Sequence, residues 1–376
     1  MPDVIYVDHH ATTPCDPRVV ERMLPYFTEH FGNAASITHA HGRKASMAVE
    51  DARISIARFF GVLPPEITFT AGATESNSLA LNLLQPGQHF ITSPLEHKSI
   101  LAPAERLAKL GVEVTYLTPD REGRIHPETL RAALRPETRL VSIEAANGEI
   151  GTVQAIAELG AICREHGVLF HTDATQAAGK VPLDLTNIDL ASFSAHKLYG
   201  PKGIGALFVR RGVRVPPLIV GGGQERGLRS GTVNVPGVIG FAAALGLGAE
   251  EMGEEAPRLA ELRDRLRDGL LEAIPGVSVN GPREVRLPGN LNLSFERIEA
   301  ESLILGMKRF SLSSGSACSS GEKGPSRALK AIGVSDERAM GSIRIGLGRS
   351  NTAEHVELLI ADLNRAVRRL REITPI

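Results

Sequence analysis

The sequence predicts an α/β protein in which a mostly parallel sheet of seven strands is flanked by helices and followed by a smaller α+β region. Three observations support this fold class. Short apolar segments alternate with amphipathic segments over roughly the first 210 residues. Polar residues follow several of the apolar segments directly. After Gly231 the alternation stops, and longer segments with helical spacing of apolar residues begin. Because alternating strands and helices usually give parallel strands, helices should cover both faces of the sheet.

The seven expected strands are short apolar or β-branched runs that end at Gly, Pro or polar residues. They cover 66–70, 89–92, 112–117, 139–145, 168–172, 189–194 and 206–210. The helices between them show apolar residues three or four positions apart, and the clearest runs over 43–60 and stops at Gly61. Further helices are expected at 17–27, 99–110, 127–134 and 154–166, and one more follows the turn at 71–76 and continues through Leu84.

The C-terminal region should form a smaller α+β domain. Expected helices cover 233–247, 255–274, 300–307 and 353–373, and short strands cover 277–280, 290–295 and 341–346. The N-terminal segment carries a short strand of its own, which we expect to join this domain. The predicted division is therefore a large domain at 14–250 and a small domain made of 1–13 and 251–376.

Composition excludes several classes of protein. The chain has 376 residues, 42% of them hydrophobic and 23% charged, with a net charge of −1 at pH 7. A balanced charge gives no reason to expect nucleic acid or an anionic membrane as a partner. The apolar runs look too short for a membrane span. Three widely spaced cysteines form neither a disulfide framework nor a zinc pattern, so we expect no metal and a cytoplasmic protein.

The tight turn between the strands at 189–194 and 206–210 presents Ser194, His196 and Lys197. A lysine beside apolar groups loses part of its preference for the charged form and becomes a usable nucleophile. Small hydroxyl and glycine neighbours suit a phosphate. Together they suggest a Schiff base with pyridoxal 5'-phosphate (PLP). A surface lysine at a strand end is the alternative, and it would be preferred for a lone lysine.

Three more polar residues near expected strand ends fit such a cofactor. Asp173 could cap a helix, but beside PLP it would keep the pyridine nitrogen protonated, which makes the ring an electron sink. Gln176 could donate to the ring oxygen. His97 is by default a half-buried structural histidine, or else a group that stacks on the ring and moves protons.

Cys318 lies in a glycine- and serine-rich stretch at 313–324, which is typical of an exposed loop and suits a nucleophile that must travel. Cys163 looks structural, because it lies on an amphipathic helix, and Cys15 looks incidental. Arg344 is expected on a short strand, where an inward guanidinium needs a partner. That partner is either a substrate carboxylate or a structural acid.

These motifs occur in an order that resembles the cysteine desulfurases of the NifS/IscS type, which are PLP enzymes of fold type I. The resemblance covers nearly the whole chain and is carried by residues 11–14, 31–36, 72–76, 96–98, 171–176, 194–197, 200–205, 221–232 and 313–318. Each motif is weak alone, and the ordered set is specific.

The resemblance implies a role for each matching residue. Lys197 would hold PLP covalently and remove the α-proton of L-cysteine, and Cys318 would accept sulfur as a persulfide and pass it to an acceptor protein, such as an iron–sulfur scaffold or a sulfur carrier. Thr232 would reach the cofactor phosphate of the other subunit of a homodimer. The remaining positions would contact the phosphate (Ala73, Thr74, Ser194, His196), the ring (His97, Asp173, Gln176) and the substrate (Asn33, Arg344).

One departure from the family pattern concerns the turn after the strand at 139–145. The family usually has Asn-Asn-Glu there, and this chain has Asn147, Gly148 and Glu149. Losing one such hydrogen bond costs about 1–3 kcal/mol, and Asn147 is a possible substitute. The alternatives are therefore a selenocysteine lyase or another PLP β-elimination enzyme, and a weakly active homologue that serves as a sulfur-relay scaffold.

Overall fold

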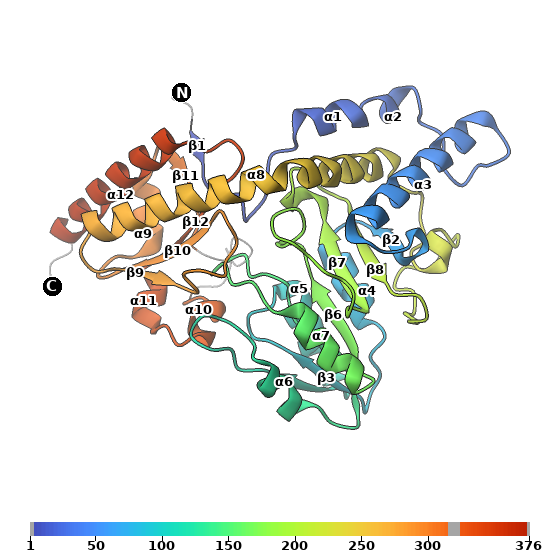
Figure 1. Cartoon of the computed structure of the whole chain (residues 1–376), viewed down its shortest axis with the longest axis horizontal. Helices are drawn as coiled ribbons and strands as arrows, with labels where there is room; N and C mark the ends of the chain where they lie inside the picture. The colour runs from blue at the N-terminus through green and yellow to red at the C-terminus, as the bar shows by residue number, and fades with distance from the viewer. Residues whose placement is uncertain (1–3, 315–323, 374–376) are drawn as a thin grey trace.

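The computed structural model describes residues 4–314 and 324–373, and its central element is a seven-stranded sheet (Figure 1). The strand order is β2-β8-β7-β6-β5-β3-β4. β8 is antiparallel to both of its neighbours, and the other pairs are parallel. The strands are β2 (Ile67–Thr70), β3 (His89–Thr92), β4 (Glu113–Tyr116), β5 (Thr138–Ser142), β6 (Leu169–Asp173), β7 (Leu190–Ser194) and β8 (Gly205–Val209). This confirms the mostly parallel α/β sheet.

Helices cover both faces of this sheet, because neighbouring strand residues point to opposite sides. Val141 and Phe170 pack into a core with α3, α7 and the first part of α8, whereas Leu140 and Leu190 pack into a core with α4 and α5. The helices of this part are α1 (Pro17–Met23), α2 (Pro25–Thr28), α3 (Ala40–Phe60), α4 (Ala73–Leu81), α5 (Lys98–Lys109), α6 (Pro127–Ala133) and α7 (Ile156–Glu165), with 3-10 turns η1 (Pro64–Glu66), η2 (Ala195–Lys197) and η3 (Glu225–Gly227).

The C-terminal part has its own three-stranded antiparallel sheet, of order β12-β10-β9, and its own apolar core. The N-terminal strand joins this part, since β1 pairs in parallel with β11. The elements are β1 (Ile5–Tyr6), β9 (Val277–Asn280), β10 (Asn290–Phe295), α9 (Ala300–Gly306), β11 (Phe310–Ser311), α10 (Arg327–Ala331), α11 (Asp336–Met340), β12 (Ser342–Gly346) and α12 (Ala353–Ile373). The sequence did not predict α10, α11 or β11.

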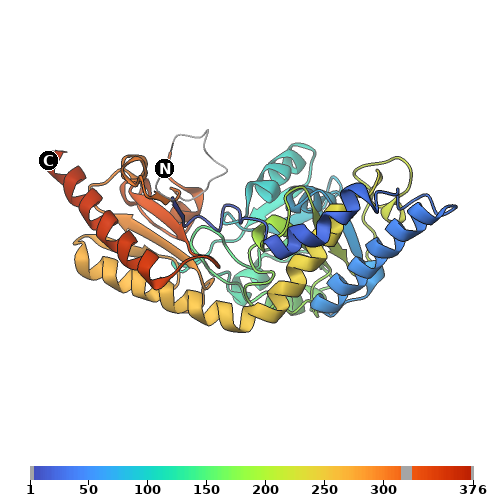
Figure 2. The ribbon, with the colours of Figure 1, turned by 90° about the horizontal axis from the view of Figure 1, so that it is seen from above.

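The residues predicted to be helical at 233–247 and 255–274 are helical almost throughout, but the break predicted between these two helices is wrong. Residues 235–273 form one helix, α8 (Val235–Ala273), which contains Pro257. The glycine- and glutamate-rich stretch between the two apolar patterns is helical because each half of α8 is anchored by a different core. Figure 2 shows α8 bending as it passes from one sheet to the other. The domain boundary at 250 stays a prediction, and α8 runs straight through it.

The expectation that no apolar segment is long enough to span a membrane needs a correction. By length and composition alone α8 passes that test, because it joins the two predicted helices. Of its most apolar window, 56% is buried inside the protein, which is what a core helix of a folded domain shows.

Candidate active site

A cavity of about 1440 Å³ lies at the carboxyl ends of the parallel strands. This is the edge at which such sheets bind ligands. It brings together most of the residues predicted from the sequence: Ala73, Thr74, His97, Asp173, Gln176, Ser194, His196, Lys197 and Arg344. Asn33 and Thr232 do not line it; both are exposed on the surface of the same chain. Cys318 lies outside the described residues.

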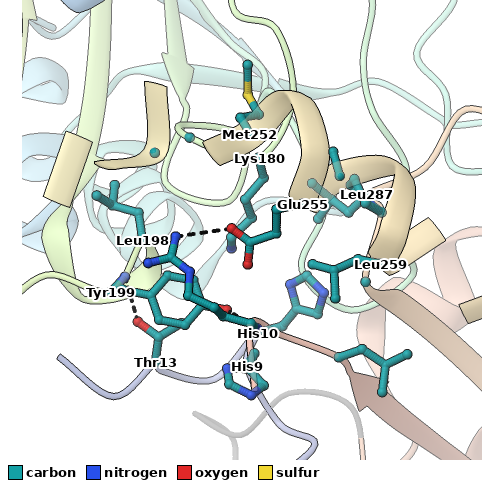
Figure 3. Close-up of a pocket in the computed structure, with 17 residues that line it drawn as sticks. His9, His10, Thr13, Lys180, Leu198, Tyr199, Met252, Glu255, Leu259 and Leu287 are labelled. Carbon is teal, nitrogen blue, oxygen red and sulfur yellow. Dashed lines mark hydrogen bonds and ion pairs between the residues drawn. The ribbon is translucent and has the colours of Figure 1, made fainter. Parts of the chain in front are cut away.

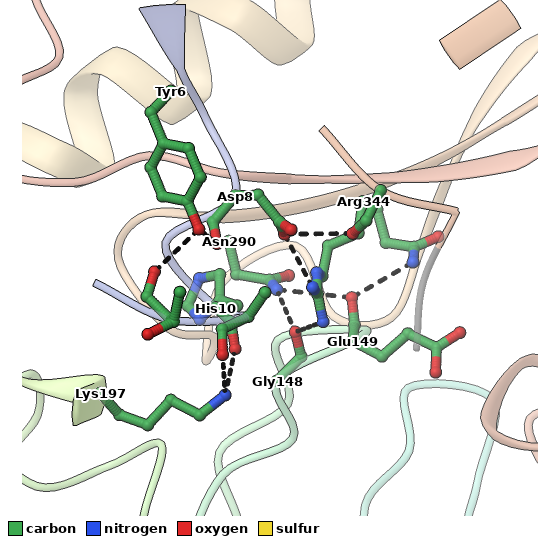
Figure 4. A network of polar contacts seen from close by, with 12 residues as sticks. Tyr6, Asp8, His10, Gly148, Glu149, Lys197, Asn290 and Arg344 are labelled. Carbon is green, nitrogen blue, oxygen red and sulfur yellow. Dashed lines mark hydrogen bonds and ion pairs between the residues drawn. The ribbon is translucent and has the colours of Figure 1, made fainter. Parts of the chain in front are cut away.

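Lys197 ends the short turn η2, and its ammonium is held by the N-terminal segment (Figure 4). Its Nζ donates hydrogen bonds to the carbonyl oxygens of His10 and Ala11, each at 2.7 Å. Thr13 fixes the backbone of the turn, because its hydroxyl donates to the His196 carbonyl at 3.0 Å and accepts from the Tyr199 amide at 2.8 Å. The segment before Pro14 therefore sets where the lysine lies.

His196 lies half-buried beside Lys197, and its Nδ1 is 3.0 Å from the Thr12 hydroxyl. Burial, and then the charge of Lys197, lower the pKa of His196 to about 4. The imidazole is therefore neutral at pH 7. A neutral ring can donate a hydrogen bond to an anion in the cavity. It does so without adding a third positive charge to those of Lys197 and Lys202.

Asp173, at the end of β6, is linked to His97 by a chain of hydrogen bonds. Asn77 donates to Asp173 Oδ2 at 2.7 Å and to the Ser99 hydroxyl at 2.8 Å, and that hydroxyl lies 2.8 Å from His97 Nδ1. The Ser99 amide also donates to His97 Nδ1 at 3.1 Å, so this nitrogen is an acceptor and the ring proton lies on Nε2. The Thr175 amide holds the other carboxylate oxygen of Asp173 at 3.0 Å.

The first turn of α4 forms the anion-binding end of the cavity. Gly72 precedes the helix with φ of 150°, and a side chain there would come within 3.5 Å of the Ser194 hydroxyl. Backbone N–H groups at a helix N-terminus favour a phosphate. With Lys197 and Asp173 lining the same cavity, the residues present fit the phosphate, the carbonyl carbon and the ring nitrogen of PLP.

Buried carboxyl groups form one wall of the cavity. The Glu144 amide donates to Glu96 Oε1 at 2.6 Å, and Asn147 donates to Glu144 Oε1 at 2.6 Å. Burial raises the pKa of Glu144 to about 8, and burial together with the Glu144 charge raises the pKa of Glu96 well above its usual range. The Glu144 side chain is therefore largely protonated at pH 7.

Asn147 does not replace the amide missing at position 148. Its Nδ2 donates to the Leu95 carbonyl and to Glu144, and its Oδ1 accepts from the amides of Glu149 and Ile150. An asparagine side chain has two donors and two acceptor positions, and all four are used in this turn. Asn147 thus holds the turn that carries Gly148 and has no group left for a ligand.

Arg344, on β12, is buried and forms a 2.7 Å ion pair with Asp8 (Figure 4). Asp8 also accepts from the Ser313 hydroxyl at 3.1 Å. The Nη1 atom of Arg344 makes only a long contact, 3.4 Å, with the Gly148 carbonyl. Its Nε has no hydrogen-bond partner among the residues that the structure describes. Both predicted types of partner are therefore compatible with the structure. The structural acid is Asp8, and a substrate carboxylate in the large cavity could reach Arg344 because Arg344 lines it.

A second, much smaller cavity of about 40 Å³ is lined by the N-terminal segment, by Lys180 and Tyr199, and by residues of α8 (Figure 3). His10 lines both cavities. Lys180 is half-buried there, and desolvation followed by the charge of Lys197 lowers its pKa to about 7. Within residues 4–314 and 324–373, several buried atoms that belong to lining residues lack a partner: both ring nitrogens of His9, Nε2 of His10, Oε1 of Glu255 and Nε of Arg349.

Sequence reasoning missed the residues that position others. His10, Thr13 and Asn77 contact Lys197, its turn and Asp173, but none carries a recognisable chemical signature. The run before Pro14 matched a family motif and so offered a signal for Thr13. The prediction for Cys163 is confirmed: its thiol is buried, and burial raises its pKa to about 12.

The fold and the site define a class of PLP enzyme, and comparison with known proteins agrees. Residues 5–359 match the family model described as "Aminotransferase class-V". The chain therefore belongs to the class-V aminotransferase family, whose members depend on PLP.

The relatives narrow this class. The chain is 51% identical to "Cysteine desulfurase IscS" of Anaeromyxobacter dehalogenans and 50% identical to the protein of that name from Methylobacillus flagellatus, over 99% of this chain and 94% of each relative. The solved structure of a "NIFS-LIKE PROTEIN" superposes with a TM-score of 0.91 at 37% identity, covering 97% of this chain and 100% of that one. The protein is a PLP-dependent cysteine desulfurase.

Proposed function

We propose that this cysteine desulfurase moves sulfur from L-cysteine to Cys318 and then, as a persulfide, to an acceptor protein in the cytoplasm. The observation that carries the proposal is the convergence of Lys197, Asp173, Gln176 and Arg344 on one cavity. An iron–sulfur scaffold or a sulfur-carrier protein fits as the acceptor, because both consume persulfide sulfur.

Different residues of the cavity would bind different parts of PLP. Ala73, Thr74, Ser194 and His196 would hold the phosphate. Asp173 would pair with the ring nitrogen, Gln176 would donate to the ring oxygen, and His97 would stack on the ring. When bound, PLP supplies an electron sink for the electron pair released at the substrate α-carbon.

The chain itself supplies the acid–base and nucleophilic groups. Lys197 Nζ, steered by the carbonyls of His10 and Ala11, removes the α-proton. Arg344, held in place by Asp8, donates from its guanidinium group to the substrate carboxylate. The Cys318 thiolate attacks the substrate sulfur, so that the carbon–sulfur bond breaks and a sulfur–sulfur bond forms. Alanine leaves after its β-carbon is protonated and Lys197 returns a proton to its α-carbon.

Residues that flank Cys318 on both sides support its role. Ser313 contacts Asp8, which pairs with Arg344, and Gly324 and Ser326 line the cavity. Both ends of the stretch that carries Cys318 are thus attached beside the place proposed for the substrate.

The proposed homodimer explains why Asn33 and Thr232 lie away from the cavity of their own chain. Large apolar side chains are exposed near both residues, for example Phe31 at 63% and Val220 at 77%. These segments lie at the end of the molecule opposite α12 (Figure 1). An apolar surface of this kind is typical of an interface between subunits.

The experiment for the sulfur transfer measures sulfide and alanine released from L-cysteine with a reductant, using PLP-loaded protein. Wild type should release both in equal amounts, Cys318→Ala neither, and the matched control Cys15→Ala both. A yellow, PLP-loaded wild type that releases neither would contradict the proposal. Release of selenide from selenocysteine, with no release of sulfide from L-cysteine, would favour a selenocysteine lyase.

The shared site is tested by mixing two inactive variants. Lys197→Ala lacks the base, and Thr232→Glu places a carboxylate where the partner's phosphate would lie. A mixed dimer contains one site with both wild-type residues, so mixing should restore activity. Failure to restore it, with both variants dimeric by light scattering, would contradict a shared site.

A further inference from the structure

His10 contacts both Lys197 and Gln176 through the same atom. Its carbonyl oxygen accepts from Lys197 Nζ at 2.7 Å and from Gln176 Nε2 at 3.0 Å. Its ring Nδ1 lies 3.1 Å from Gln176 Oε1. The side chain is 3% exposed. Two groups of His10 thus contact the two ends of one amide.

These contacts fix which atom donates. A carbonyl oxygen only accepts, so the nitrogen end of the Gln176 amide faces the His10 backbone and the oxygen end faces the ring. Lys180 Nζ donates to the same oxygen at 3.2 Å. His10 Nδ1 must therefore carry a hydrogen, and one N–H of Gln176 remains for a ligand in the large cavity, which Gln176 lines.

The other ring nitrogen faces the small cavity. Nε2 of His10 has no partner within residues 4–314 and 324–373, and as the unprotonated nitrogen it is an acceptor. A cavity of about 40 Å³ has room for water, since one water needs roughly 10–15 Å³ measured in this way. Burial, and then the charges of Lys180, Arg344 and Lys197, lower the pKa of His10 well below its usual range, so the ring stays neutral.

Gly148 provides the space that this arrangement needs. A Cβ atom at position 148 would lie 2.5 Å from Gln176 Nε2 and 2.8 Å from its Cδ. These distances are shorter than atoms can approach without one of them moving. A side chain at 148 and the observed orientation of Gln176 exclude each other.

We propose that His10 is a positioning residue, which together with the open space at Gly148 fixes the Gln176 amide so that it presents an N–H to the oxygen of the PLP ring. The inference rests on the proposed role of Gln176 at the cofactor. It explains how the site keeps a directed donor although position 148 has no side chain and the Asn147 amide is fully used.

The test compares His10→Phe, which keeps the ring volume without a donor, with His10→Asn, which keeps an N–H close to the position of Nδ1. The readout is the pH at which the visible absorption band of the PLP-loaded protein changes, recorded without substrate, together with kcat and KM for L-cysteine. We expect His10→Phe to shift that pH and to lower kcat about tenfold, and His10→Asn to restore both. Equal behaviour of the two variants would overturn the proposal.

Gly148→Ala and the double variant His10→Phe/Gly148→Ala add a second arm. Gly148→Ala should shift the band alone, because the amide must move, and the double variant should show less than the sum of the two single effects. Additive effects would overturn the proposal.

A third measurement needs no stable variant. Nitrogen-15 NMR of histidine-labelled, PLP-loaded protein should show His10 as the neutral tautomer protonated at Nδ1, and an Nε2-protonated ring would overturn the proposal. Gln176→Leu tests the role of Gln176 at the cofactor, on which the inference rests. If the absorption band of this variant responds to pH as in wild type, Gln176 does not contact the PLP ring oxygen and the inference fails. A band that depends on His10 in a protein without sulfide release would support the positioning role and contradict only the proposed function.

Discussion

Asn77 and Asp173 lie 96 residues apart in sequence and are joined by a 2.7 Å hydrogen bond inside the protein. The bond ties the first helix after the anion-binding turn to the end of the central strand. Asn77 also donates to Ser99, which contacts His97. One amide thus orients both the carboxylate proposed for the PLP ring nitrogen and, through Ser99, the histidine proposed to stack on the ring.

Asn77→Ala should weaken the binding of PLP. Without the amide, Asp173 keeps only the Thr175 contact and loses its fixed orientation, which costs about 1 kcal/mol, or roughly a fivefold rise in the dissociation constant. Titration of apo-protein with PLP, followed by absorption, measures this. Asn82→Ala, at the other end of α4, is the control, and equal constants for the two variants would contradict the prediction.

Arg344→Lys should raise KM for L-cysteine about tenfold with a smaller effect on kcat. A lysine can pair with Asp8 but lacks the second set of donors that the guanidinium directs away from that pair. Steady-state alanine release gives both constants. Arg338→Lys, on the exposed helix α11, should leave them unchanged. A variant that loses kcat alone would show that Arg344 acts on the reaction and not on substrate binding.

Glu144→Gln should make stability less sensitive to alkaline pH. The pKa of Glu144 rises from 4.5 to about 8 on folding, so its contribution is fully present below pH 4.5 and is lost as pH rises towards 8. At pH 8.5 the variant should exceed wild type by up to about 4 kcal/mol more than it does at pH 5.

Urea unfolding of apo-protein at the two pH values measures that difference. Glu158→Gln, whose side chain is exposed on α7, serves as the control and should follow wild type at both. Parallel curves for Glu144→Gln and wild type would show that Glu144 is ionised in the folded protein.

Glu225→Ala should destabilise the protein by about 3–5 kcal/mol. Glu225 forms two 2.8 Å contacts with Arg53, both side chains are nearly inaccessible, and the carboxylate also accepts from the Phe69 amide. Removing it leaves the buried Arg53 to pair with Glu50, whose side chain is 54% exposed, and leaves the Phe69 amide without this acceptor. Glu357→Ala breaks a 2.7 Å pair with Arg265 whose side chains are about half exposed, and it should change the free energy of unfolding by under about 1 kcal/mol.

The sequence predicted the sheet well because each strand is a separate apolar run. The helix 353–373 was predicted with its observed bounds, and most strands within two residues. The α8 helix was not predicted as one element, because residues 248–254 show no apolar face and their helical state depends on packing at both ends.

The site was predictable to the extent that it matched known motifs. Such matches predicted Lys197, Asp173 and His97 as site residues, and all three line one cavity in the structure. His10 and Asn77 were not found, because their importance comes from contacts across 187 and 96 residues that no local pattern records. The orientation of Gln176 depends on both His10 and Gly148, and it becomes visible only when the three are seen together.

The N-terminal segment makes the position of Lys197 depend on both parts of the protein. Residues 5–13 contact His196 beside the large sheet, and Phe310 and Arg344 in the C-terminal part. The carbonyl groups that hold Lys197 therefore take their final position only when both parts are folded. A partly folded protein could form its central sheet and still leave Lys197 misplaced.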